Sequence, residues 1–342
     1  MQLQAPTPAP APAPTGRRPL LQIGSALLAG LLPLLASPAL ADSSAWPNKP
    51  IKWIVAYPAG GGSDFLARQL APFMGKQLGQ TFIIDNRPGA GGSIGTDAAA
   101  KAPADGYTVL SGDNGAMVFN SAMYKKLPYS PSDFTPVGLM ARFPLLLVVH
   151  PGAGFSSASQ WLAELKKNPG KYSYASPGIG SPHHLAMELI KERSQTFVVH
   201  VPYRGTAFAI QDLMAGVVPM AILDTAASLG QIRAGKLKPL AVLSPKRIAQ
   251  LPDVPTFEEL GLKGVDVSAW QGLFVPKGTP EPIVQRLTAE LHKAIALPEV
   301  KARLEDFGLQ VVPGDGPALG RFVLQETQTW HALIKQRKLA AE

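Results

Sequence analysis

The segment Tyr57–Asp64, which reads YPAGGGSD, combines residue types whose spacing indicates a binding chemistry. Its three glycines separate an apolar run typical of a strand from a periodic run typical of a helix. Glycines allow backbone N–H groups to turn toward a ligand. The first turn of the helix adds unpaired N–H groups and the positive end of the helix dipole. The segment therefore predicts an anion site, although the same residues also suit a tight turn that Ser63 or Asp64 caps.

A second segment, Ser176–Leu185, repeats this order of strand end, glycines, serine and helix start with the sequence SPGIGSPHHL. Ligands of α/β proteins bind at the carboxyl ends of strands. Two such loops, one in each of two lobes, would face each other across a cleft and hold an anion between them. His183 and His184 are adjacent, so on a helix their side chains diverge and do not chelate one metal ion.

Polar residues also follow two later predicted strands. Tyr203, Arg204 and Gly205 come directly after one of them, and Asp224 ends another. We expect Arg204 either to pair with a ligand carboxylate or to lie in solvent. We expect Asp224 either to cap a helix or to bind a ligand amine or a water molecule.

The catalytic and cofactor motifs that this sequence approaches are incomplete. No lysine follows the glycines of Tyr57–Asp64, which excludes a nucleotide phosphate loop. The run GAGGSIG, Gly89–Gly95, misses the spacing of a dinucleotide fingerprint by one residue. Ser181 is followed by proline, and Ser63 has glycines on one side only, so neither serine fits the elbow of serine hydrolases. We therefore expect no cofactor, no metal ion and no enzymatic activity.

The two glycine loops need a scaffold in which strands and helices alternate. Residues 51–57 predict a strand, and residues 63–79 predict a helix with apolar side chains at helical spacing. Residues 81–85 and 107–112 predict further strands, and the same alternation continues to about residue 244. This order is typical of an α/β protein with a parallel sheet.

Two segments, near 145–150 and 271–275, are apolar at almost every position, as in strands buried on both faces. They bracket one α/β unit, and we expect them to be the two crossings between two lobes that hinge over a cleft. Residues 46–145 plus 270–342 would form lobe 1, and residues 149–267 would form lobe 2. A single large sheet is the alternative.

Residues 1–41 have the pattern of an export signal. An Ala-Pro-rich leader is followed by Arg17 and Arg18, an apolar run and the small residues of PALA. This order predicts a signal peptide that is cleaved near Ala41, and a periplasmic location. The twin arginines leave the Sec and Tat routes open. The chain has no cysteine, so its own apolar cores must hold the exported protein together.

The composition narrows the class of partner. The 342 residues are 46% hydrophobic, which is enough for two cores. The net charge of +8 fits either an ordinary basic surface or electrostatic steering of anionic ligands. Basic residues are not clustered with aromatic ones, so we expect no nucleic-acid partner.

Several runs, taken in order, resemble the Bug (TctC-like) family of periplasmic solute receptors, which serve tripartite tricarboxylate transporters. The matching runs are WPNKPIKWIVAYPAGGGSD, IIDNRPGAGGSIGTDAAAKAPADGYTVL, YSYASPGIGSPHHLAMEL, VHVPYRGTAFAIQDLMAG, IRAGKLKPLAV, LPDVPTFEELG and WQGLFVPKGTPEPIV. They cover nearly all of residues 46–340. The resemblance implies an α/β, two-lobed periplasmic binding protein, a Venus flytrap of the type II-like kind with two crossings between its lobes.

The resemblance also implies a carboxylate site. Family members bind small organic anions, whose carboxylate is held by backbone amides and small side chains of the two loops together with ordered waters. The ligand-binding residues implied are Tyr57, Gly60, Gly61, Ser63 and Asp64 on the first lobe, Ser176, Gly178, Gly180, Ser181 and His184 on the second, Tyr203, Gly205 and Asp224 nearby, and Ser111 and Asn114 at the exit of the third strand.

Three positions depart from the family pattern. Ala59 stands where the family commonly has proline, Arg204 where it usually has lysine, and Thr225 where it often has asparagine. Arg204 and Thr225 lie close to the positions that set ligand identity. No substrate is therefore carried over from the family.

Three functions fit these features. The leading one is a receptor that captures a small organic carboxylate by hinge closure and delivers it to the membrane subunits of a tripartite tricarboxylate-type transporter. A sensor whose closed form docks on a signalling partner has the same sequence requirements. The third is a secreted enzyme that uses Asp64, His184 and Asp224 as acid and base. We expect the receptor to be a monomer.

Overall fold

The computed structural model describes residues 46–340. The predicted signal peptide, residues 1–41, lies outside the described residues. Within them, no helix combines the length and the apolar character that crossing a membrane would need.

The first section of sheet is built from parallel strands that alternate with helices, as the sequence predicts. Strand β1 lies between β2 and β3 and is parallel to both. The elements of this section are β1 (Ile51–Val55), α1 (Gly62–Leu78), β2 (Phe82–Asn86), η2 (Ala90–Gly92), α2 (Ser93–Ala100), β3 (Thr108–Asp113), η3 (Gly115–Phe119), α3 (Asn120–Met123) and η4 (Pro131–Asp133).

The second section is a similar parallel unit, in which β5 lies between β6 and β7. It begins after the single-turn η5 (Pro151–Ala153). Its elements are α4 (Ala158–Lys167), β5 (Ser173–Ser176), α5 (Pro182–Ser194), β6 (Val199–Pro202), α6 (Thr206–Met214), β7 (Met220–Asp224), α7 (Thr225–Arg233) and β8 (Lys238–Val242).

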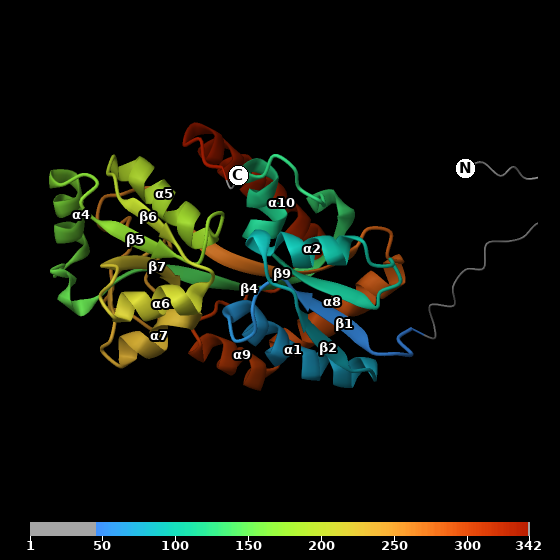
Figure 1. Ribbon diagram of the computed structural model, residues 1–342. Coiled ribbons are helices and arrows are strands. Elements are labelled where there is room, and N and C mark those ends of the chain that lie inside the picture. The colour runs from blue at the N-terminus through green and yellow to red at the C-terminus, as the bar shows by residue number, and fades with distance from the viewer. Residues whose placement is uncertain (1–45, 341–342) are drawn as a thin grey trace, which may run out of the picture. The chain divides into compact units, whose positions relative to one another are not determined.

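Strand β4 (Phe134–Val149) belongs to both sections. Its residues 134–144 pair with β9 (Ser268–Pro276), and residues 145–149 pair with β7 and β8. The chain therefore crosses from one section to the other along β4, as Figure 1 shows, and it returns through residues 243–267 into β9. The described strands form one continuous hydrogen-bonded path, as the alternative of a single sheet expects. Of the two segments expected as crossings, the one near 145–150 lies in β4, whereas 271–275 lies inside β9, which pairs with β3 and with residues 134–144 of β4 in the first section. Residues 243–267 make the return crossing instead. The boundaries predicted for the lobes stay a prediction.

The first half of β4 was not predicted as a strand. Pro136 and Gly138, which both disfavour strand interiors, lie within it. The pairing with β9 shifts register between Pro136 and Gly138 and again between Leu139 and Ala141. Such bulges admit residues that a regular ladder would reject, which is why the sequence pattern does not reveal this strand.

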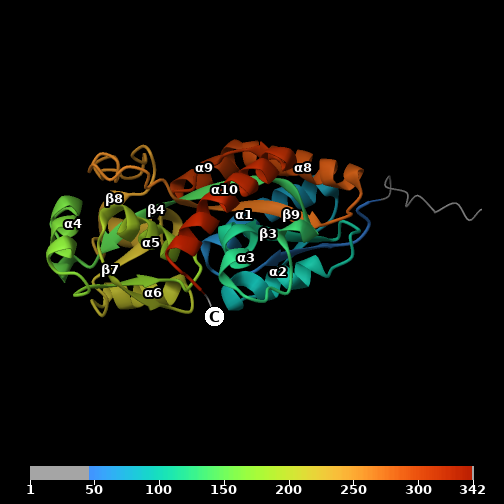
Figure 2. The same ribbon diagram turned by 90° about the horizontal axis from the view of Figure 1, so that it is seen from above.

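The C-terminal part of the chain covers the first section. It comprises α8 (Glu281–Ala296), α9 (Pro298–Asp306), the short β10 (Gly314–Asp315), which pairs with β4, and α10 (Gly316–Gln336). The residues that the sequence places at a period of four in α8, Ile283, Leu287, Leu291 and Ile295, are all buried in one cluster with α1. Figure 2 shows α10 leaving the side of α8 and α9 and ending near α5.

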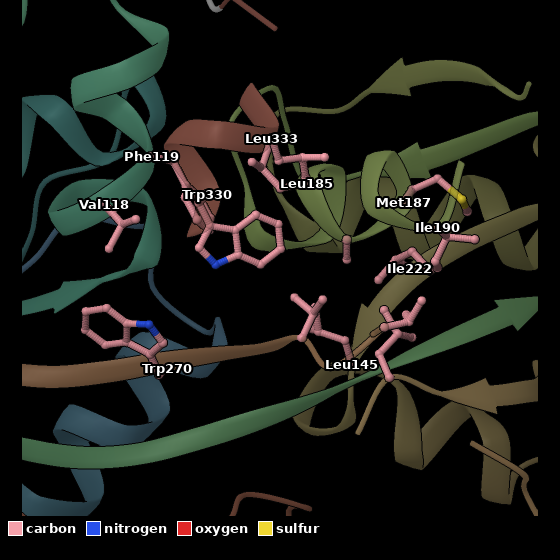
Figure 3. Close-up of a cluster of buried hydrophobic side chains, with 14 of the residues drawn as sticks. Val118, Phe119, Leu145, Leu185, Met187, Ile190, Ile222, Trp270, Trp330 and Leu333 are labelled. Carbon is pink, nitrogen blue, oxygen red and sulfur yellow. The ribbon is translucent and has the colours of Figure 1, made fainter. Parts of the chain in front are cut away.

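One apolar cluster is shared by both sections. Trp270 of β9 and Trp330 of α10 belong to it together with Leu185 of α5 and Ile222 of β7. Figure 3 shows these side chains in one group with Leu145, the residue of β4 at which the pairing changes from one section to the other. Burial of this common core couples the two sections by packing as well as by the strands that join them.

An ion cluster also joins α5 to the end of α10. The buried carboxylate of Glu188 accepts hydrogen bonds from Lys191 and, 3.0 Å away, from Nη2 of Arg337. Burial raises the pKa of Glu188, but the hydrogen bonds from Lys191 and Arg337 lower it more, so the net shift is downward. Glu188 is therefore ionised in the folded protein at neutral pH.

Replacing Glu188 by glutamine should destabilise the fold, because the buried Lys191 then loses its carboxylate partner. We expect a loss of about 3 kcal/mol or more at pH 7. A carboxyl with a lowered folded pKa stabilises above its unfolded pKa of about 4.3, and this contribution disappears as the pH falls through the folded value. Urea unfolding of wild type and variant should therefore differ at pH 7, and the difference should shrink as the pH falls below about 4.3.

The matched control is Glu192→Gln, which lies four residues, about one helical turn, after Glu188 in α5. Glu192 is only partly buried and accepts a hydrogen bond from Gln336 at 3.4 Å. It should cost less than about 1 kcal/mol. An equal loss in both variants, or a loss for Glu188→Gln that does not depend on pH, would contradict the role assigned to the buried carboxylate.

Candidate functional site

Strand directions bring the carboxyl ends of the two sections together. Strand β9 is antiparallel to both β3 and β4, so β3 points in the direction of β4, toward the second section. Strand β7 is antiparallel to β4 and points toward the first section. Asp113 ends β3 and pairs with Gln271 of β9, which in turn pairs with residue 141 of β4. Asp224 ends β7 and pairs with residue 145 of β4. Four residues of strand span about 13 Å.

Close approaches between the loops agree with this geometry. A Cβ placed on Gly62, in the first glycine loop, would lie 3.9 Å from Cβ of Ala226 at the start of α7. A Cβ placed on Gly180, in the second glycine loop, would lie 3.4 Å from Sδ of Met123 in α3. The two loops predicted from the sequence thus each lie close to the opposite section.

Asp64 holds the first loop in shape. Its carboxylate accepts hydrogen bonds from the Gly60 N–H at 2.9 Å, from Arg68 and from Asn86. Burial raises the pKa of Asp64, but these hydrogen bonds lower it more, so the net shift is downward. The side chain of Asp64 is fully engaged within its own loop, and its contribution to a site is to position the glycines.

The first turn of α1 offers unpaired amides. Gly61 is the N-cap and has no side chain to cap the helix. The N–H groups of Gly62, Ser63 and Asp64 donate no hydrogen bond among the described residues. The Ser63 hydroxyl accepts a hydrogen bond from Gln271 Nε2 of β9. This turn therefore has the free donors and the positive dipole end that the sequence predicts for an anion site.

The second loop differs from the prediction. The N–H groups of Gly178, Gly180 and Ser181 donate to Ser176 Oγ, His184 Nδ1 and the Gly178 carbonyl. The expectation that this loop presents unpaired amides is wrong for these three residues. Glycine is needed at Gly178 and Gly180, where φ is 150° and 78°, so the loop closes on itself and its own side chains consume the donors.

A stack of rings supports the second loop. His184 lies on His200 with ring centroids 4.2 Å apart, and His200 lies on Tyr174 at 4.8 Å. His200 Nε2 is 2.6 Å from Ser176 Oγ. Burial is the main cause that lowers the pKa of His184 to about 4 and the pKa of His200 to about 3. Both rings are therefore neutral at physiological pH and act as hydrogen-bonding groups.

Free amides in the second section occur instead at α6. Gly205 is its N-cap with φ of 122° and no capping side chain, and its own N–H donates to the Pro177 carbonyl. Among the described residues, no hydrogen bond leaves the N–H groups of residues 206–208. Tyr203 donates to Asp212 at 2.8 Å, and mainly because of burial the pKa of Tyr203 is raised to about 12. The hydroxyl proton of Tyr203 is therefore already donated to Asp212.

Asp224 caps α7, which is one of the two alternatives left by the sequence. Its Oδ1 accepts from the Ala227 N–H at 2.8 Å, and its Oδ2 lies 3.1 Å from His183 Nε2. The neighbouring Thr225, where the family often has asparagine, donates its hydroxyl proton to the Gly308 carbonyl. That departure from the family pattern therefore serves packing against the segment after α9.

The structure does not bring the side chains of Ser111 and Asn114 to the loops. Ser111 Oγ is buried and accepts a hydrogen bond from Trp53 Nε1 at 2.8 Å. Asn114 is fully buried, where its Oδ1 accepts from the Trp270 N–H and its Nδ2 donates to the Ser268 carbonyl. Both side chains hold strands together.

Sequence reasoning missed three polar residues near the meeting edges. Asp113 is buried and bonded to the Tyr57 hydroxyl, and burial raises the pKa of both groups. Gln271 and Asn120 are also buried, and each has a side-chain oxygen without a partner among the described residues. Gln271 had a readable signal, because it is the one strongly polar side chain inside the apolar run that forms β9.

Two surface cavities lie away from the loops. One, of about 750 Å³, is lined by α1 and β2 residues such as Lys76 and Phe82. The other, of about 240 Å³, lies between α2 and the segment after α3. In the described part of the chain, no cluster of three or more histidine, cysteine or acidic residues is arranged to hold a metal ion.

The sequence matches one family model and several known proteins. The family model described as "Tripartite tricarboxylate transporter family receptor" matches residues 66–339. A protein from Pseudomonas sp. strain P51, called UPF0065 protein in the tcbD-tcbE intergenic region, is 42% identical over 87% of this chain and 89% of its own. Protein BugT of Bordetella pertussis is 36% identical over 88% of this chain and 93% of its own.

Solved structures agree with these relatives. The R. palustris protein Rpa4515 with adipate superposes with a TM-score of 0.83 at 33% identity, over 86% of this chain and 99% of that one. The periplasmic binding protein BugD gives 0.79 at 35% identity, over 86% and 99%. MatC from Rhodopseudomonas palustris with bound malate gives 0.78 at 32% identity, over 84% and 100%. The α/β, two-lobed fold expected from the sequence is thereby confirmed.

The histidine stack can be tested by NMR. Because burial lowers both pKa values far below the ordinary 6.5, the ring C–H shifts of His184 and His200 should stay constant between pH 8 and pH 5. The unfolded chain takes up these protons from about pH 6.5 downward, so stability should fall with acidification between about pH 6.5 and 4. His184→Gln and His200→Gln variants assign the signals, and a midpoint near 6.5 would show that the rings are not buried as described.

Proposed function

This chain belongs to the tripartite tricarboxylate transporter receptor family, and on that basis we propose that it captures a small organic carboxylate and delivers it to a membrane transporter. The similar protein BugD is a periplasmic binding protein, and two other similar structures carry adipate and malate. We propose a periplasmic location for this chain as well. The membrane subunits of a tripartite tricarboxylate-type transporter are the proposed partners of a monomeric receptor.

The observation that supports capture of an anion is the uncapped first turn of α1. Its free amides at Gly62, Ser63 and Asp64 lie beside the start of α7 in the other section. Charge-assisted hydrogen bonds from such donors are each worth about 1.5–3 kcal/mol. A carboxylate bound there would also accept hydrogen bonds from the uncapped start of α6, which follows Gly205 in the opposite section. Binding to both helix starts would draw the two sections together.

The proposed contact set is narrower than the set expected from the sequence. It keeps Ser63 as an amide-bearing position and Tyr57 in the wall. Gly61 and Gly205 are kept as the N-cap residues that leave the amides of Gly62 and of residues 206–208 free. Asp64, His184 and Ser176 are proposed to position loops, because their polar atoms are bound within those loops. Delivery follows from closure, since a partner can distinguish the closed arrangement from the open one.

Catalysis by the acid and base candidates receives no support from the geometry. Asp64 is bonded to Gly60, Arg68 and Asn86, whereas His184 accepts from Gly180. Asp224 is bonded to other residues again, so no two of the three candidate groups are hydrogen-bonded to each other. General acid–base catalysis needs such groups within reach of one reacting centre.

A thermal-shift screen over small mono- and dicarboxylates, including malate and adipate, tests the proposal. A ligand that binds only the folded state at 100 times its Kd adds about 2.7 kcal/mol and raises Tm by several degrees. We expect at least one carboxylate to do so, with unchanged ligand recovered after incubation. Formation of product in excess of protein would favour an enzyme, and no stabilisation by any carboxylate would refute the receptor.

A matched pair of variants isolates one amide. Gly62 is the first residue of α1, where proline fits the backbone, and the preceding Gly61 has the extended ψ of 171° that proline requires. Gly62→Pro removes the N–H, whereas Gly62→Ala keeps it and adds the same crowding against Phe143. Calorimetry with the carboxylate found in the screen should show binding about 10-fold weaker for Gly62→Pro than for Gly62→Ala. Equal affinities would exclude this amide from the site.

A further inference from the structure

Asn120, the first residue of α3, is only 1% exposed, and its amide nitrogen is heavily used. Nδ2 lies 3.1 Å from the Gly91 carbonyl oxygen, 3.2 Å from Ser93 Oγ and 3.2 Å from the Tyr129 hydroxyl. The amide is therefore surrounded by oxygen atoms on one side. No sequence motif pointed to this residue.

These contacts fix which way the amide points. A carbonyl can only accept, so the Gly91 oxygen requires the nitrogen of Asn120. The Tyr129 hydroxyl donates its proton to the Ala116 carbonyl at 2.8 Å, so it too must accept from Asn120. If the amide were reversed, Asn120 Oδ1 would face the Gly91 carbonyl oxygen and the Tyr129 hydroxyl oxygen, neither of which could donate to it. The assignment of O and N thus follows from the network itself.

The oxygen on the other side, Asn120 Oδ1, is buried and has no hydrogen-bond partner in the described part of the chain. It would lie 3.6 Å from a Cβ placed on Gly91 and 3.8 Å from a Cβ placed on Gly180. Gly91 belongs to the first section and Gly180 to the second glycine loop. The unpaired acceptor therefore lies between the two sections.

The wall that carries Asn120 is continuous with the first glycine loop. A Cβ placed on Gly92 would lie 3.3 Å from the Tyr57 hydroxyl, and one placed on Gly115 would lie 3.1 Å from it and 3.8 Å from the Gly91 carbonyl. Tyr57 opens the YPAGGGSD segment that leads into the free amides of α1. Tyr57 thus joins the segment that carries the free amides to the loops that surround Asn120.

Gln271 does not carry the same inference, although its Oε1 is also unpaired. Within the described residues, the hydrogen-bond partner of its side chain is the Ser63 hydroxyl, which can donate or accept. The amide of Gln271 can therefore present either its oxygen or its nitrogen. Asn120 is the residue whose network leaves an acceptor and nothing else.

We propose that Asn120 Oδ1 receives a hydrogen bond from the ligand, so that this receptor selects carboxylates bearing a hydroxyl, amide or ammonium donor over their unsubstituted counterparts. The proposal rests on the proposed function and adds a substrate class to it. A buried acceptor without a partner is costly, and binding a ligand that supplies the donor removes that cost. A ligand that lacks the donor leaves the oxygen unsatisfied.

Matched ligands test the proposal by calorimetry. The probes are succinate, malate, aspartate and 2-methoxysuccinate, with glutarate, 2-hydroxyglutarate and glutamate as the longer series. Wild type should bind the donor-bearing member of a series about 10-fold or more tightly than the unsubstituted acid. 2-Methoxysuccinate, whose ether oxygen cannot donate, should show no such gain.

Variants then assign the preference to Asn120. Asn120→Ala should reduce the ratio between malate and succinate, or between the longer pair, to within about 2-fold. Asn120→Asp keeps the size and an acceptor but adds a negative charge, so it should shift the preference from the hydroxy acid toward the amino acid by about 10-fold. It provides the test if the alanine variant does not fold.

Ser93→Ala is the matched control, because it removes one neighbour of Nδ2 and leaves Oδ1 in place. Its ratios should equal those of wild type. Loss of the preference in Ser93→Ala as well would show that loop disruption, and not the acceptor, is responsible, and would overturn the proposal. So would tighter or equal binding of the unsubstituted acids by wild type, although carboxylate capture would then still stand. Failure of every probe to bind, together with a negative screen, would remove both.

Discussion

The backbone hydrogen bonds of β4 are divided between two sections of sheet, and this division fixes the direction of every strand around them. Residues 134–144 pair with β9, and residues 145–149 pair with β7 and β8. Antiparallel pairing on each side turns the parallel strands of the two sections toward each other. Helices that follow parallel strands start at the carboxyl edge, so α1, α5, α6 and α7 all begin where the sections meet.

The helix starts at this edge are not equivalent. Those of α5 and α7 are capped by Ser181 and Asp224, which satisfy part of their free N–H groups. Those of α1 and α6 begin after Gly61 and Gly205, which have no side chain to do so. Uncapped starts cost folding stability, and their retention on both sides of the meeting edges is consistent with donors kept for an anionic ligand.

Polar side chains around these starts mostly act on one another. Asp64 fixes the first loop, while Ser176, His184 and His200 fix the second. Such networks keep small backbone donors in place without a large positive charge. Asn120 differs from these residues because its Nδ2 has hydrogen-bond partners, whereas its Oδ1 has none among the described residues.

Sequence alone determined the class of fold, the alternation of strands and helices, the glycine loops and the family resemblance, because these depend on local periodicity and on short runs of characteristic residues. The apolar stripe of α8 and the free first turn of α1 after Gly61 are of this kind. Only the tertiary structure decided that Ser176 and His184 take up the amides of Gly178 and Gly180, because both side chains are held by His200 of the next strand. It likewise placed Asn120 near Gly180, since the two are 60 positions apart and proximity across such a separation leaves no local pattern.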